Sequence, residues 1–321
     1  MMETGRYFLG VDGGGTKTAF VLVDQAGAVA ASHEESNAYH LQIGLDGLRD
    51  VLAAGVRALL AKVGIGAGAI RHAFFGLPAY GEDSRIQPLI DALPEQILGH
   101  RRYHCGNDMV CGWAGSLGGE DGINIVAGTG SIGYGEREGR AARAGGWGEL
   151  FSDEGSAHWI AVQGLNLFSR MSDGRRPKGP LHAMMMDLFA LSSELDLSGR
   201  IMAGDAASRD HVASLSRLVS RAAEQGDDQA AAILVAAAQE LVAIVEAVRV
   251  SLGYRAGQPV PVSYSGGVFR AGDGILVPFR AALAQTGVDY VLSPPRFTPM
   301  LGAAIQAARL AGYPLRPCAV P

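Results

Sequence analysis

Short apolar runs alternate with glycine-containing turns at the start of the chain. The runs cover residues 7–12 and 19–24, with a third candidate over 28–33, and only tight turns separate them. Three consecutive strands joined by such turns predict an antiparallel meander. Apolar residues then recur on one face of 45–63 at helical spacing, which predicts a helix there.

The same pattern starts again in the second half of the chain. Residues 122–127 form an apolar run that ends at a Gly-Thr-Gly-Ser turn, and residues 132–138 continue as a strand. This repetition indicates a weak internal duplication. Further strands are predicted over 71–77, 101–105 and 260–264, and further helices over 108–117, 154–171, 208–224, 228–252 and 299–311.

The length of 321 residues predicts two domains rather than one. The boundary is expected in the polar, glycine-rich stretch 117–121, which gives domains 1–118 and 119–321. The last helix, 299–311, belongs to the second domain in sequence but is a candidate to pack on the first domain. Residues 172–180 are polar and predict an exposed loop.

Composition and charge narrow the class of protein. Hydrophobic residues make up 48% of the chain and charged residues 18%, which is typical of a soluble protein with a substantial core. The net charge is −5 without a basic cluster, so no nucleic-acid partner is expected. The long apolar stretch 230–252 is interrupted by charged and amide side chains, so it predicts a buried helix and no membrane partner.

The N-terminus lacks the basic start and long apolar core of a signal peptide, and cysteine is scarce. The three cysteines, Cys105, Cys111 and Cys318, form no CxxC pair, so neither a disulfide framework nor a structural zinc site is expected. These features predict a cytoplasmic protein.

Glycine is unusually common, with 45 residues, about twice its usual share of ~7%. Two of its clusters match familiar nucleotide motifs only in part. Gly128-x-Gly130-x-x-Gly133 lacks the helix that must follow a dinucleotide fingerprint. The segment 10–18 nearly fits a P-loop, but Thr16 separates the last glycine from the lysine and a strand follows. Both matches are rejected.

The tract from Asp12 to Thr16 nevertheless has the chemistry of a phosphate site. Its three glycines allow backbone N–H groups to surround an anion, and Asp12 can hold Mg²⁺ through water. A hairpin turn with a capping aspartate explains the same residues equally well. Gly128–Ser131 repeats this chemistry in the second half, and Gly266-Gly267 after an apolar strand is a third candidate, for which a simple strand-to-helix turn is the favoured interpretation taken alone.

Two aspartates stand where predicted helices begin. Asp108 follows a short strand, and Asp153 precedes the helix predicted over 154–171. Helix capping is the ordinary interpretation of each. Asn37, in a polar stretch after the third strand, carries little information by itself.

These motifs, in this order, resemble the actin-like ATPase and sugar kinase superfamily over about residues 7–311. The similarity is greatest to the N-acetylglucosamine kinase branch, which is grouped with the BadF/BadG/BcrA/BcrD-type ATPases, and strongest over 145–163 (GGWGELFSDEGSAHWIAVQ). The resemblance implies an α/β fold of two ribonuclease-H-like (actin/hexokinase-type) domains, with an active-site cleft between them.

The resemblance also implies roles for particular residues. Asp108 is the expected catalytic base, and Asn37 and Asp153 are expected to bind sugar hydroxyls, with Gly128 and Thr129 near the sugar. The residues expected to bind ATP are Asp12, Gly13, Gly14, Gly15, Thr16, Lys17, Gly128, Thr129, Gly130, Ser131, Gly266 and Gly267, with Asp12 also near Mg²⁺.

The implied activity is phosphorylation of an amino sugar by ATP, most plausibly N-acetylglucosamine at O6, by a homodimeric enzyme. Ala144, Ser152 and the Tyr39-His40 pair depart from the family pattern, which leaves the acyl-group specificity open and keeps glucosamine as an alternative. Two rivals of other classes remain: an iron–sulfur activator ATPase, which needs suitably placed cysteines, and a sugar sensor without catalysis.

Overall fold

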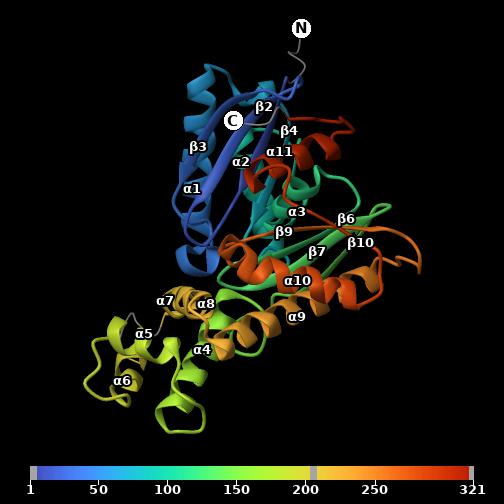
Figure 1. Cartoon of the computed structure of the whole chain (residues 1–321). Helices are drawn as coiled ribbons and strands as arrows, with labels where there is room; N and C mark the ends of the chain where they lie inside the picture. Colours follow the sequence, from blue (N-terminus) through green and yellow to red (C-terminus); the bar gives the residue numbers. More distant parts are fainter. Residues whose placement is uncertain (1–5, 203–207, 318–321) are drawn as a thin grey trace. The chain divides into compact units, whose positions relative to one another are not determined.

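The computed structural model describes residues 6–202 and 208–317 (Figure 1). The chain divides into two compact units, one formed by Met1–Asp121 with Pro294–Pro321 and the other by Gly122–Ser293. The first break lies close to the boundary that the sequence predicts. The second unit ends before the C-terminal segment, whereas the sequence-based division extended the second domain to residue 321.

The first unit contains a five-stranded sheet in the order β3-β2-β1-β4-β5. β1 pairs antiparallel with β2, and β2 with β3, so the predicted meander is confirmed. β1, β4 and β5 run parallel, which brings their carboxyl ends to one edge of the sheet. The strands are Tyr7–Asp12, Thr18–Asp24, Val29–Glu35, Ile70–Leu77 and Tyr103–Asn107.

The second unit repeats this topology. Its sheet has the order β10-β9-β6-β7-β8, with antiparallel pairs β6–β7 and β7–β8 and parallel pairs β6–β9 and β9–β10. Read from β8 to β10, the order and the directions match those of the first sheet, which confirms the predicted duplication. The strands are Gly122–Ala127, Ser131–Arg137, Arg140–Gly145, Val260–Ser265 and Tyr290–Ser293.

Helices cover both faces of the first sheet. On one face, α1 and α2 pack on strand residues such as Leu9, Val11 and Phe20. On the opposite face, α11 packs on β1 and also on α3. The helices are α1 (His40–Val63, kinked at Gly44), α2 (Gln87–Leu98), α3 (Met109–Leu117) and α11 (Pro299–Leu310), with a 3₁₀ turn at Ala67–Ala69.

Close backbone contact explains why the C-terminal helix belongs to the first unit. A Cβ added at Gly10 of β1 would lie 2.4 Å from the backbone nitrogen of Ala304 in α11. A Cβ at Gly302 would lie 2.3 Å from the backbone nitrogen of Gly115 in α3. Glycine at these positions lets α11 lie directly against the strand and helix backbones.

The sheet of the second unit carries a larger set of helices. The segment predicted as one helix over 208–224 forms two, because the chain turns at Leu215 with a hydrogen bond from its N–H to the Val212 carbonyl at 3.0 Å. The helices are α4 (Ala157–Ser172), α5 (Pro180–Leu188), α6 (Asp196–Met202), α7 (Arg209–Ser214), α8 (Ser216–Glu224), α9 (Asp228–Ser251) and α10 (Asp273–Gln285), with a 3₁₀ turn at Val268–Ala271.

By length and composition, α9 is the one helix in the described part of the chain that could cross a membrane. It packs against β6, β7 and β8 and against α4, α8 and α10. Its buried residues belong to the core of the second unit and include Leu234, Leu241 and Val245. In this structure the helix is a core element, as its interrupted apolar pattern predicts.

Candidate functional site

The first set of predicted site residues lies at the carboxyl edge of the first sheet. Asp12 is the last residue of β1, and Asp108 directly follows β5. The strand between them, β4, pairs with both, so parallel pairing brings together two aspartates that are distant in sequence. Loops at the carboxyl ends of parallel strands are the usual place for ligand sites in α/β proteins.

The surroundings raise the pKa values of both carboxyl groups. Burial and, to a lesser extent, the nearby Asp108 carboxylate together raise the pKa of Asp12 to about 7. Burial also raises the pKa of Asp108 to about 6. Removal from water and a neighbouring negative charge both disfavour a carboxylate, and a bound cation would offset both effects. Carboxyl groups perturbed in this way are typical of functional sites.

Asp108 occupies the N-cap position of α3. Within the described residues of α3, no side-chain capping hydrogen bond joins Asp108 to the helix. The N–H of Met109 donates instead to Asn107 Oδ1 at 3.1 Å, and Asn107 Nδ2 donates to the Tyr80 carbonyl at 3.2 Å. Asn107 therefore supplies a side-chain hydrogen bond at this turn, while the backbone N–H groups of Met109 and Asp108 lower the pKa of the Asp108 carboxyl against the larger effect of burial.

A buried thiol lies behind the two aspartates, and sequence reasoning gave it no role in the site. Cys111 is fully buried, and burial together with the charges of Asp12 and Asp108 raises its thiol pKa. Its position depends on Gly76 in β4, where an added Cβ would lie 2.2 Å from Cys111 Sγ. The sequence offered one indication of this position: Cys111 follows Asp108 by about one helical turn, which places both on the same face of α3.

The first glycine loop is anchored to the same edge. The N–H of Gly13 donates to the Gly76 carbonyl at 2.8 Å, and the N–H of Ala38 donates to the Gly14 carbonyl at 3.0 Å. Gly15, Thr16 and Lys17 are exposed to solvent, so their backbone is open to a ligand. The Lys17 ammonium pairs with Glu34 at 2.5 Å, so its predicted role in ATP binding would require it to leave this partner.

Asn37 lies next to that loop in the first unit. It directly precedes Ala38, whose N–H is bonded to Gly14. Asn37 Oδ1 accepts from the N–H of Tyr39, and its Nδ2 donates to Gln42 Oε1, both at 3.3 Å. These long bonds leave a half-buried amide that can exchange its partners for the hydroxyl groups of a sugar.

The second set of predicted residues lies on the second unit, around the turn between β6 and β7. The Gly128 carbonyl accepts from the N–H of Ala157 at 2.9 Å, and the Thr129 carbonyl accepts from the N–H of His158 at 3.3 Å. Ser131 Oγ donates to the Glu154 carbonyl at 2.7 Å. The turn is thus fastened to the start of α4.

Asp153 is brought directly to this turn. Its side chain is 3% exposed, and Oδ1 accepts from the N–H of Ser131 at 3.4 Å. The cap of α4 is Ser156, whose Oγ accepts from the N–H of Trp159 at 3.1 Å. Asp153 is therefore not the helix cap, and its carboxylate is engaged by the turn instead.

Gly266 also lies beside the second turn. Its φ is +101°, a conformation that favours glycine, and an added Cβ would lie 2.3 Å from the carbonyl oxygen of Ala127. The parallel pairing of β6 with β9 produces this approach. Gly267 follows as the residue before the 3₁₀ turn. Gly266 is thus close to the Gly128–Ser131 turn.

The carboxyl groups of the first unit suit Mg²⁺ held jointly with a nucleotide. Among residues 6–202 and 208–317, no group of three or more His, Cys, Asp or Glu side chains is arranged to hold a metal ion. Mg²⁺ usually binds through one or two carboxylates together with substrate phosphates and water. Asp12, with Asp108 nearby, meets that requirement because its protein ligands are few and acidic.

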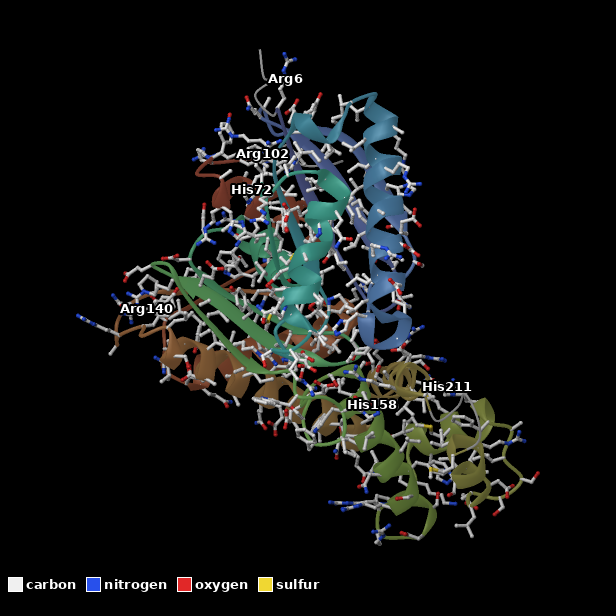
Figure 2. All side chains as sticks on the ribbon, turned by 180° about the vertical axis from the view of Figure 1, so that it is seen from behind. Arg6, His72, Arg102, Arg140, His158 and His211 are labelled. Atoms are coloured by element: carbon white, nitrogen blue, oxygen red, sulfur yellow. The ribbon has the colours of Figure 1, made fainter. Side chains whose placement is uncertain are left out.

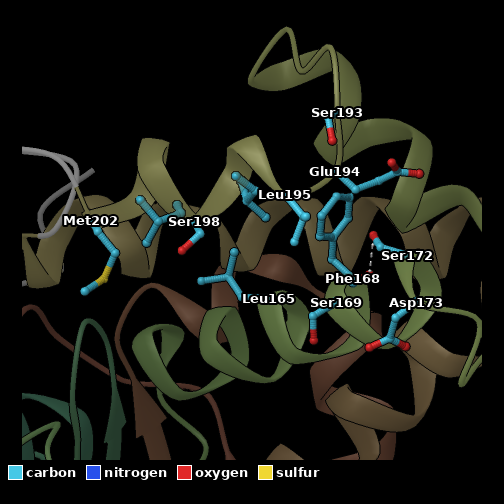
Figure 3. Close-up of a pocket in the computed structure, with 12 residues that line it drawn as sticks. Leu165, Phe168, Ser169, Ser172, Asp173, Ser193, Glu194, Leu195, Ser198 and Met202 are labelled. Carbon is cyan, nitrogen blue, oxygen red and sulfur yellow. Dashed lines mark hydrogen bonds between the residues drawn. The ribbon is translucent and has the colours of Figure 1, made fainter.

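A cavity elsewhere in the second unit differs from the predicted site in location and composition. It has a volume of about 600 Å³ and lies among α4, α6 and the segment between α5 and α6 (Figure 3). Phe168, Leu195 and Met202 are among its largely apolar lining, which contains no predicted site residue. The strand-end residues therefore define the candidate site, since they bring together carboxylates and phosphate-binding backbone.

Comparison with known proteins identifies the family of this chain. Residues 9–307 match the BadF/BadG/BcrA/BcrD ATPase family, which is nearly the whole chain. The chain belongs to this family. The similar proteins include the N-acetyl-D-glucosamine kinase of Dictyostelium discoideum, which is 30% identical over 81% of this chain and 84% of the relative.

Two further relatives extend the comparison of this BadF-type chain. An N-acetylmuramic acid/N-acetylglucosamine kinase of Clostridium acetobutylicum is 36% identical over 50% of this chain and 53% of its own length. A solved structure from Chromobacterium violaceum, assigned as an N-acetylglucosamine kinase, has a TM-score of 0.72 and 28% identity, and covers 94% of this chain and 99% of its own. The two-domain sugar-kinase fold expected from the sequence is thereby confirmed.

Proposed function

We propose that this protein is a hexosamine kinase that transfers the γ-phosphoryl group of ATP to O6 of N-acetylglucosamine. The observation that carries the proposal is the pair of carboxyl groups, Asp12 and Asp108, which parallel strand pairing brings to one edge of the first sheet beside the first glycine loop. Relatives named as N-acetylglucosamine kinases support the choice of sugar. A homodimer in the cytoplasm is part of the same proposal.

In the proposed reaction, Asp108 accepts the proton of the attacking sugar hydroxyl. A pKa of about 6 suits this role, because a general base is most effective when its pKa lies near the working pH. Asn37 and Asp153 orient the sugar ring through its hydroxyl groups. Phosphoryl transfer needs mainly such positioning, together with stabilisation of charge on the phosphate oxygens.

Charge stabilisation is assigned to the two glycine loops and to Asp12. The backbone N–H groups of 13–17 and 128–131 would donate to phosphate oxygens, and Gly266 would leave room on the adenosine side. Asp12 would hold Mg²⁺ through water, and the ion would offset negative charge on the phosphates. The ion would thereby reduce the electrostatic repulsion between the two carboxylates and the triphosphate.

The burial of the cysteines distinguishes the proposed kinase from the alternative of an iron–sulfur activator ATPase. A cluster shared between two subunits needs accessible thiols. In the described part of the chain, Cys105 and Cys111 are free, and Cys111 is fully buried behind Asp12. Burial also raises the pKa of the Cys105 thiol, which disfavours the thiolate that binds iron. Cys318 lies outside the described residues. These observations favour the kinase over the activator.

A coupled ADP-release assay with Mg²⁺-ATP tests the proposal. The sugars are N-acetylglucosamine, glucosamine, N-acetylmannosamine, N-acetylmuramic acid and glucose, with a reaction without sugar as the control. We expect the highest kcat/KM with N-acetylglucosamine. Turnover confined to glucosamine would instead establish the alternative kinase. ADP release that does not depend on sugar would support the activator ATPase, and sugar-induced stabilisation without ADP release would support a sensor.

A further inference from the structure

An arginine that sequence reasoning missed lies against the predicted sugar carboxylate. Arg209, the first residue of α7, donates from Nη2 to Asp153 Oδ2 at 2.5 Å, and its Nε lies 3.2 Å from Glu149 Oε2. The Asp153 side chain is 3% exposed, whereas that of Arg209 is 41% exposed. A nearly buried carboxylate is thus paired with a guanidinium group that still reaches solvent.

The glycine loop packs directly on this ion pair. A Cβ at Gly130 would lie 2.4 Å from Arg209 Nη2 and 2.7 Å from Asp153 Oδ2. The loop can approach only because residue 130 has no side chain. The other oxygen of Asp153 accepts from the N–H of Ser131. One carboxylate oxygen is therefore held by the loop and the other by α7.

The next residue of α7 holds the same loop at a second point. Asp210 Oδ1 accepts a hydrogen bond from the Thr129 hydroxyl at 3.1 Å. α7 itself packs on α4, and Figure 2 shows His158 of α4 and His211 of α7 in the same part of the second unit. Two neighbouring residues thus connect α7 both to the phosphate loop and to the predicted sugar ligand.

The backbone of Asp153 shows that its position is imposed by these surroundings. Its φ is +61°, in the left-handed region that residues with a side chain seldom occupy. Such a conformation persists where neighbouring contacts over-determine it, and it is concentrated at functional sites. A buried carboxylate also needs a charged partner, and a guanidinium fork supplies charge and direction together.

We propose that Arg209 is a positioning residue for the sugar. It fixes the Asp153 carboxylate in the orientation that a sugar hydroxyl requires, while Asp210 fixes Thr129 beside it. Arg209 acts through Asp153 rather than on the reacting atoms, so its loss should weaken sugar binding more than it slows phosphoryl transfer. This inference rests on the proposed hexosamine kinase function.

The first test compares three variants of the full chain in the ADP-release assay. Arg209→Gln should raise the sugar KM about 10- to 100-fold, the scale of a lost hydrogen bond to a charged group, with a smaller change in kcat. Arg209→Lys should recover part of the loss, because lysine restores the charge without the fork. Arg217→Gln, which removes an exposed charge of α8, is the matched control and should leave KM unchanged.

The second test is a double-mutant cycle with Asp153→Asn. If Arg209 acts through Asp153, Arg209→Gln should change the sugar KM little once Asp153 is replaced. Equal effects in both backgrounds, or a wild-type KM for Arg209→Gln, would overturn the proposal. Melting temperatures identify variants that fold poorly, in which case Arg209→Lys completes the cycle.

Failure of the proposed function gives a different result. A wild-type protein that phosphorylates none of the sugars would refute the kinase, whatever Arg209 does. The same cycle is then measured on the dissociation constant for N-acetylglucosamine by calorimetry. Non-additive loss of binding would still support the positioning role, and additive loss, or no sugar binding at all, would refute it.

Discussion

Replacing Asp108 by asparagine keeps the size and shape of the side chain but removes the group that is proposed to accept the hydroxyl proton. Its carboxyl lies at the strand edge with Asp12, and burial raises its pKa to about 6. A positioned general base contributes about 10²- to 10⁴-fold to the rate, or about 2.7 to 5.4 kcal/mol of activation free energy. We therefore expect Asp108→Asn to lower kcat by at least about 10²-fold.

The measurement is the steady-state ADP-release assay together with the dissociation constant for the sugar. The sugar affinity should change little, because asparagine retains a hydrogen-bonding oxygen at the same place. Asp46→Asn is the matched control, since that aspartate is 89% exposed on α1 and its replacement should leave kcat unaltered. A kcat within threefold of wild type for Asp108→Asn, with the control also normal, would refute the assignment of Asp108 as the base.

The remaining predictions concern stability and the glycine contacts. Because the folded-state pKa values of Asp12 and Asp108 are raised from 3.8 to about 7 and about 6, these groups reduce stability as pH rises from about 4 to about 7. Asp108→Asn should therefore melt at the same temperature as wild type near pH 4 and higher near pH 7.5; a lower melting temperature at pH 7.5 would contradict this. Gly76→Ala should lower the free energy of unfolding, measured in urea, by about 1 to 3 kcal/mol, because the new methyl group clashes with the Cys111 thiol. The loss should be smaller in the double variant with Cys111→Ala, which removes that thiol. Gly266→Ala should weaken ATP binding at least about tenfold in calorimetry, because alanine is strained at this φ and its methyl group clashes with a β6 carbonyl. An unchanged affinity would argue against a nucleotide contact at Gly266.

The sequence alone determined the features that depend on neighbouring residues. Apolar runs that end at glycine turns located β1, β2, β6 and β7, and their recurrence indicated the duplication that the two sheets confirm. The order of the motifs along the chain also indicated the family, because that order can be read without knowing how the strands pair. The resemblance to the family, rather than the residues taken singly, selected Asp12 and Asp108 as expected site residues.

Tertiary structure decided what distant segments contribute. The sequence allowed the C-terminal helix to pack on the first domain, and the structure shows how it does so: glycines at positions 10, 115 and 302 permit backbone contact. The position of Asp108 beside Asp12 depends on the parallel pairing of β4 with both β1 and β5, which joins segments distant in sequence. Arg209 and Asp153 are 56 residues apart, so their pairing depends on how α7 folds back toward the second loop. Local propensity specifies elements and turns, whereas a buried charge finds its partner only when the whole unit has packed.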